Sequence, residues 1–104
     1  MSKKNKNKNK NKSKSKTYGA GNATCAEYLK VADDELKKEL FLSWAQGFIS
    51  GLNLSNNGDL LGEFGNSELL TAWLEQYCKK NPLEQFDAAI FRYISFAIKE
   101  RSKG

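Results

Sequence analysis

Histidine is absent from this 104-residue sequence, which also has only one proline, one methionine and two cysteines. Without histidine, the Ser/His and Cys/His pairs that activate many protein nucleophiles cannot form. Two cysteines without a histidine make a poor zinc site, and residues 56–59 (NNGD) lack the acidic ligands of a calcium loop. We therefore predict that the protein is not an enzyme and holds no metal and no cofactor.

Long apolar runs are missing as well. No apolar stretch approaches the roughly 18 residues that a membrane-spanning helix needs, so we predict no membrane span. The N-terminus also lacks the apolar segment of a signal peptide.

Basic charge is concentrated in residues 1–16, which contain 8 of the 17 basic residues and no acidic one. The rest of the chain has 9 basic and 12 acidic residues. Because the tract alternates lysine with asparagine or serine and has nothing apolar to bury, we predict a disordered tail over 1–16 and one helical domain over 17–104.

Two interpretations of the lysine-rich tail are open. A polycation can contact nucleic acid or anionic lipid by neutralising phosphates. However, no arginine or aromatic residue interleaves the lysines, so bidentate phosphate contacts and base stacking are missing. We interpret the tract as a solubility tag and expect no nucleic-acid binding.

The two cysteines, Cys25 and Cys78, are far apart in the sequence. In a cytosolic protein such a pair is more often two buried thiols, whereas in an exported protein it is one disulfide. Small domains often need such a covalent link, so we favour the disulfide. An exported protein needs a leader, and we expect that the native signal peptide has been removed.

Apolar residues at helical spacing predict four helices, over about 25–31, 34–52, 67–80 and 82–101. Thr24 and Glu27 fit a capping box before the first helix, and Asn81 with Pro82 fits an N-cap and first helical residue for the fourth. Candidate caps of the second and third helices are Asp33, Asp34, Asn66 and Ser67. No period-two alternation occurs, so the predicted fold is all-α, a compact four-helix domain with one disulfide.

Residues 44–51 (WAQGFISG) place two glycines in the second helix. Each glycine costs about 1 kcal/mol relative to alanine inside a helix. Gly47 and Gly51 share a helical arc with Leu40 and Trp44, so we predict that they face the core and let another helix approach closely. The predicted helix-packing residues are Trp44, Gly47, Phe48, Gly51, Trp73 and Tyr77.

Leu42 and Ile49 lie outside that arc, and they either close the edge of the core or face a partner. Residues 53–65 form the one long loop, and loops of this length are often functional. We expect its apolar residues to fold back on the core, and we look for partner specificity here. The candidate partner-binding residues are Leu42, Ile49, Leu60, Leu61 and Phe64.

Asp87 interrupts the apolar arc of the fourth helix, near Ile94 and Ile98. One interpretation is a first-turn carboxylate that the helix dipole stabilises. The other is a partly buried acid that titrates as a pH sensor.

Several short motifs resemble the small periplasmic helical proteins grouped with the acid-stress chaperone HdeA. They are CAEYL (25–29), WxxGFxxGxN (44–53), LxxWLxxYCxxNP (70–82) and AA (88–89), and the resemblance covers about residues 24–98. It implies a periplasmic all-helical domain with a Cys25–Cys78 disulfide, often a homodimer. The chain is also similar to a related helical group that neutralises type VI secretion effectors, in which a Gly-aromatic-x-x-Gly helix precedes a Tyr-x-x-x-x-Pro segment.

The sequence thus predicts a non-catalytic periplasmic protein that binds other proteins. Its partners are unfolded clients if it is an acid-stress chaperone, or a cognate toxin if it is an immunity protein. Protonation of the 12 acidic residues would move the domain's side-chain charge from −3 to about +9, and this repulsion would loosen packing. Such a response is not specific to chaperones, so both alternatives stay open.

Overall fold

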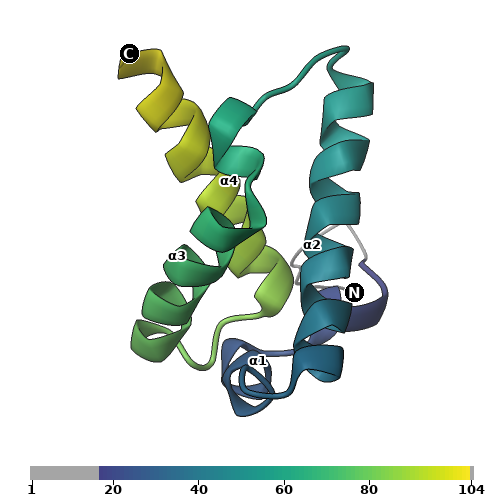
Figure 1. The fold of residues 1–104 in the computed structure, drawn as a ribbon, viewed down its shortest axis with the longest axis vertical. Coiled ribbons are helices and arrows are strands. Elements are labelled where there is room, and N and C mark those ends of the chain that lie inside the picture. The colour runs from purple at the N-terminus through teal and green to yellow at the C-terminus, as the bar shows by residue number, and fades with distance from the viewer. Residues whose placement is uncertain (1–16, 104) are drawn as a thin grey trace, which may run out of the picture.

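The computed structural model describes residues 17–103, and most of these residues are helical (Figure 1). The elements are η1 (Gly19–Asn22), α1 (Cys25–Lys30), α2 (Glu35–Ser55), η2 (Gly62–Gly65), α3 (Ser67–Lys80) and α4 (Phe86–Lys103). Within the described range no strand forms, and none of the helices is long and apolar enough to cross a membrane. The predicted all-α fold with four α-helices is confirmed, while the predicted disordered tail, 1–16, lies outside the described residues.

The first three α-helices begin at caps that the sequence predicted. The Glu27 amide donates to the Thr24 hydroxyl (3.1 Å), and the Thr24 amide donates to the Glu27 carboxylate (2.8 Å), which completes the capping box. Asp34 caps α2 by accepting a hydrogen bond from the Lys37 amide, and Asn66 caps α3.

The predicted start of the fourth helix is wrong, because α4 begins at Phe86 rather than at Pro82. Asn81 is instead the C-cap of α3. The segment between the two helices runs beside the start of α1, where the Cys25 amide donates to the Glu84 carbonyl (2.7 Å). The first amides of a helix have no hydrogen-bond partner inside it. Those of α1 bond to carbonyls of this segment, which would have bonded within α4 if α4 began at Pro82.

The core lies between α1, α3 and α4, and α2 closes one side of it with Leu42, Ala45 and Ile49. Figure 1 shows α2 running beside α3 and α4. The largest fully buried side chains of the core include Tyr28, Leu61, Leu70, Leu74, Phe86, Ile90 and Tyr93. The predicted disulfide is confirmed: Cys25 and Cys78 link α1 to the end of α3, with 4.9 Å between their Cα atoms.

The buried face of α2 only partly overlaps the predicted one, which also included Leu40. Ala45 is fully buried, and Phe41 packs edge-on against Tyr28 and Phe86 (ring centroids 5.4 and 5.0 Å apart). Leu40, by contrast, is 69 % exposed. Apolar residues occupy most of the circumference of α2, so periodicity alone did not show which side faces the core.

Gly47 and Gly51 therefore do not pack a neighbouring helix, and that prediction is wrong. A Cβ atom placed on either glycine would meet no atom of the described chain within 4 Å. The close approach occurs at Gly21 in η1, where a Cβ would overlap the indole ring of Trp44. The Trp44 Nε1 also donates to the Tyr18 carbonyl (2.6 Å), so this ring fixes η1 against α2.

Two alanine substitutions test this orientation of α2. Gly47→Ala should raise the free energy of unfolding by about 1 kcal/mol, because a helix gains stability and nothing in the chain is displaced. Gly21→Ala should lower it by about 1–3 kcal/mol, because the new methyl group meets the Trp44 ring. Urea unfolding followed by circular dichroism measures both. The opposite ranking would show that α2 is rotated from the position described.

Ionisation of the Tyr28 hydroxyl should make the stability of the protein depend on pH in the alkaline range. Burial, with the nearby charge of Glu75 as the second cause, raises the Tyr28 pKa from 10.0 to about 12. The unfolded state therefore loses this proton first, and stability present below pH 10 is lost as pH rises toward 12. A pKa difference of two units between the folded and unfolded states corresponds to about 2.7 kcal/mol of unfolding free energy.

Tyr28→Phe should remove that part of the alkaline destabilisation. The Tyr28 hydroxyl has no hydrogen-bond partner among the described residues, so the change should leave stability at neutral pH unchanged or raise it by about 1 kcal/mol. Thermal unfolding between pH 7 and pH 12 measures the two effects. A Tyr28→Phe variant that is less stable at neutral pH would show that the hydroxyl has a partner.

Candidate functional site

Two adjoining cavities follow one side of α2 and separate it from α3 and the loop before α3. The first has a volume of about 380 Å³ and is lined by Lys38, Leu42, Ser67, Glu68, Thr71, Ala72 and Glu75. The second has a volume of about 370 Å³ and is lined by Gln46, Ile49, Ser50, Asn53, Asp59 and Gly65. Because the α2 residues recur at three- and four-residue spacing, the cavities share one helix face. We call them together the α2–α3 groove.

The floor of the α2–α3 groove contains Leu42 and Ile49, with only 6 % and 8 % of their surface exposed. Of the two alternatives that the sequence left open, closure of the core's edge is the one that the structure shows. Their assignment as candidate partner-binding residues stays a prediction. They can touch a partner only as the base of a concave site.

The rim of the α2–α3 groove is mostly acidic. It carries the carboxylates of Asp59, Glu68 and Glu75 and a single ammonium group, that of Lys38. Over residues 17–103 the one ion pair is between Lys103 and Glu100, so none of these four charges is neutralised by a direct ion pair there. A positively charged group of a partner would therefore find unpaired carboxylates at this rim.

The loop beside the groove is fixed to the body, as expected. Leu61 is fully buried, Leu60 and Phe64 are half-buried, and the Phe64 carbonyl accepts a hydrogen bond from the Tyr93 hydroxyl. The Asn53 side chain accepts a hydrogen bond from the Leu60 amide (2.9 Å). Burial removes Leu61 from the candidate partner-binding residues, because no partner can reach it.

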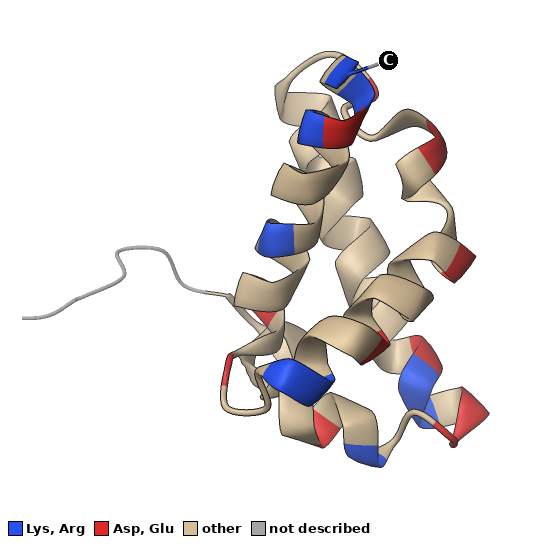
Figure 2. Ribbon diagram, turned by 90° about the vertical axis from the view of Figure 1, so that its left-hand side faces the viewer, with Lys and Arg blue, Asp and Glu red and all other residues tan. Residues whose placement is uncertain are grey.

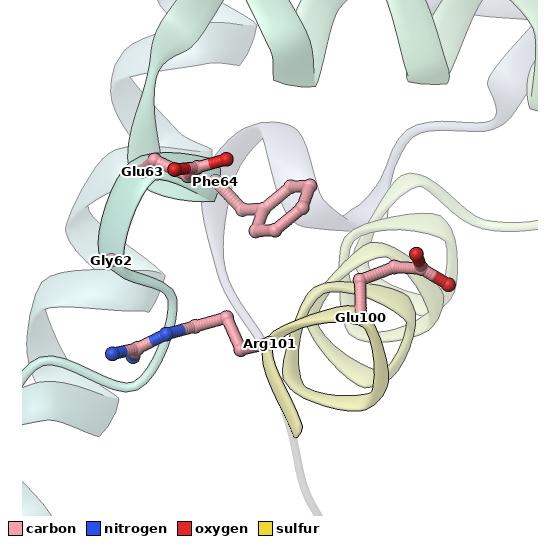
Figure 3. Close-up of a pocket in the computed structure, with 5 residues that line it drawn as sticks. All are labelled: Gly62, Glu63, Phe64, Glu100 and Arg101. Carbon is pink, nitrogen blue, oxygen red and sulfur yellow. The ribbon is translucent and has the colours of Figure 1, made fainter. Parts of the chain in front are cut away.

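A third cavity, of about 370 Å³, lies between η2 and the end of α4, where Arg101 extends beneath Gly62 while Glu100 points away from it (Figure 3). The Arg101 guanidinium donates to the carbonyls of Asp59 (2.7 Å) and Leu60 (2.8 Å). Gly62 has φ +57°, and a Cβ there would lie 2.9 Å from Arg101. The arginine is thus engaged in holding the loop on α4.

The predicted packing aromatics do pack. Trp44 stacks on Phe48 (ring centroids 5.4 Å apart), and Trp73 stacks on Tyr77 (4.8 Å) and meets Tyr93 edge-on (5.4 Å). Trp73 and Tyr77 also line, with Gln76 and Lys80, a cavity of about 180 Å³ beside α3.

Asp87 lies in the first turn of α4 and is half-buried. Its carboxylate accepts a hydrogen bond from the Thr17 hydroxyl (2.7 Å), which ties the start of the described chain to α4. A pH-sensing role for Asp87 stays a prediction.

Chemistry at these sites is limited by the groups present. In the part of the chain that the structure describes, no group of three or more potential metal ligands gathers, and both cysteines are in the disulfide. Figure 2 shows acidic and basic residues intermixed, mainly toward the two ends of the body. The arrangement offers a concave, partly apolar surface with carboxylates, which suits binding.

Sequence reasoning missed the α3 side of the groove. Glu68, Thr71 and Glu75 recur at helical spacing and resemble an ordinary solvated face. On α2, the uncharged polar residues Gln46 and Asn53 are the only sequence feature that could indicate a groove at this position. Such a hint does not distinguish a groove from solvent.

Comparison of the chain with protein-family models, with curated proteins and with solved structures found no match in any of the three. The resemblance to HdeA-like proteins therefore rests on the short sequence motifs alone.

Proposed function

We propose that this protein acts without catalysis, by binding another protein in the α2–α3 groove. We also propose that it is exported to an oxidising compartment such as the periplasm. The observation that carries the proposal is the groove itself, with Leu42 and Ile49 at its floor and unpaired carboxylates at its rim. Protein-binding sites commonly combine a desolvated apolar centre with a polar rim. The disulfide supports export, because disulfides persist in oxidising compartments.

The expected partner is a protein that presents lysine or arginine. The groove's lining includes three carboxylates and one ammonium group, so a basic side chain gains attraction and an acidic one is repelled. The apolar floor would also stabilise an aliphatic side chain of the partner next to the basic one, because both apolar surfaces leave water.

An acid-stress chaperone is the first form of this proposal, in keeping with the HdeA-like motifs. At low pH the domain's carboxylates lose their charge while its basic residues keep theirs, and repulsion loosens packing. The disulfide joins α1 to α3, whereas α2 lies in the loop between the two cysteines and has no disulfide of its own. Acid loosening would therefore act first on α2 and uncover Leu42 and Ile49 to unfolded clients.

An immunity-type inhibitor is the second form, and the preformed groove favours it. A fixed concave site suits one folded partner, since binding then requires little rearrangement. In this form the cognate toxin places a basic segment in the groove at neutral pH.

Acidification separates the two forms. If the protein is a chaperone, fluorescence of a hydrophobic dye should rise at about pH 2–3, and aggregation of an acid-denatured client should be suppressed there but not at neutral pH. The disulfide-reduced protein is the control for general unfolding. A protein that stays compact and passive in acid is not a chaperone.

Charge reversal in the groove tests binding at neutral pH. The double variant E68K/E75K should bind a toxin encoded beside this gene at least about tenfold more weakly, because attraction for a basic segment becomes repulsion. The matched control, E63K/E100K, changes the charge equally at the η2–α4 cavity and should bind like the parent. Equal loss in both variants, or in neither, would contradict binding in the groove.

A further inference from the structure

The side of α2 that turns away from the body is apolar and uncovered. Leu36, Leu40 and Leu54 have 83 %, 69 % and 81 % of their surface exposed. At 100° per residue these leucines and the two open glycines, Gly47 and Gly51, fall within an arc of about 60°. We call these five residues the outer face of α2.

The outer face extends along most of the helix, about 27 Å from Leu36 to Leu54 at 1.5 Å per residue. Within the described chain nothing packs over its middle, where an added Cβ on Gly47 or Gly51 would meet no atom within 4 Å. Glycine weakens a helix, so two glycines on a side that no part of the described body covers are not explained by packing within the monomer.

We propose that the outer face of α2 binds the same face of a second copy, with the two helices antiparallel. The five residues of the outer face are placed nearly symmetrically about residue 45 of the sequence. Antiparallel pairing therefore sets Leu36 beside Leu54 of the second copy, and Leu40 over the notch that Gly47 and Gly51 leave. Each contact then occurs twice, as a twofold interface requires.

The charges of α2 favour this direction. Every charged residue of the helix lies within Glu35 to Glu39, and residues 40–55 carry none. A parallel pair would place these charges opposite their own copies. In an antiparallel pair they face the uncharged half of the second copy, and the helix dipoles oppose each other favourably.

The same charges argue against a lipid surface as the occupant. Helices that lie on anionic membranes carry lysine and arginine along their polar face. Here Lys37 and Lys38 are balanced by Glu35 and Glu39, and no base follows them in α2. The proposal is independent of the one for the groove, whose lining contains none of the five outer-face residues.

The oligomeric state of the full chain, measured by sedimentation velocity and light scattering over a micromolar to millimolar range at neutral pH, tests the pairing. The parent should form a dimer that dissociates on dilution. L36E and L54K should each weaken the dimer by at least about tenfold, because a charge is placed against a leucine. Circular dichroism should be unchanged, since both side chains are exposed in the monomer.

The double variant L36E/L54K should recover the dimer, because antiparallel pairing joins the new carboxylate of one copy to the new ammonium of the other. The matched control is L83E, which adds a charge at a leucine that is 89 % exposed and lies outside α2, and it should dimerise like the parent. A monomeric parent at every concentration, equal weakening by L83E, or no recovery in the double variant would each overturn the proposal. Binding of the monomer to anionic vesicles through these leucines would do the same.

Discussion

The rest of the structure depends on the junction between α1 and the segment that joins α3 to α4. The Cys25–Cys78 disulfide closes a sequence separation of 53 residues there, which the chain-entropy model values at roughly 4 kcal/mol. Backbone hydrogen bonds from Cys25 to Glu84 and from Phe86 to Ala23 surround it. A helix of six residues is too short to be stable by itself. This junction is therefore what allows α1 to form and to cover the core.

The second helix has a different kind of support. It is held by rings, chiefly Phe41 against Tyr28 and Phe86, and by the Trp44 indole under η1. Both surfaces for which we propose partners, the α2–α3 groove and the outer face, involve this helix. The molecule thus combines a disulfide-linked junction of α1 and α3 with a longer helix that has one side in the core and two sides for binding.

Local signals in the sequence were reliable wherever the local chemistry decided the outcome. The capping box at Thr24 and the cap at Asn66 depend on residues three or fewer apart, and both form. Asn81 and Pro82 carry an equally good local signal, yet tertiary hydrogen bonds to α1 outcompete it. The orientation of α2 could not be predicted because the sequence does not rank one apolar face against another. What decided it was contact with rings 13 residues before and 45 residues after Phe41. The groove depends on the distance between helices, which no single segment encodes.

The two tryptophans lie on different helices, Trp44 on α2 and Trp73 on α3. Trp44 is stacked on Phe48 and covers Gly21, whereas Trp73 is stacked on Tyr77 and contacts Tyr93. Each indole therefore senses a separate part of the molecule, and replacing either one with phenylalanine leaves a single intrinsic fluorophore. Emission from Trp44 would follow detachment of α2 from η1, and emission from Trp73 would follow separation of α3 from α4. The chain thus carries its own optical reporters of whether α2 and the α3–α4 pair come apart together.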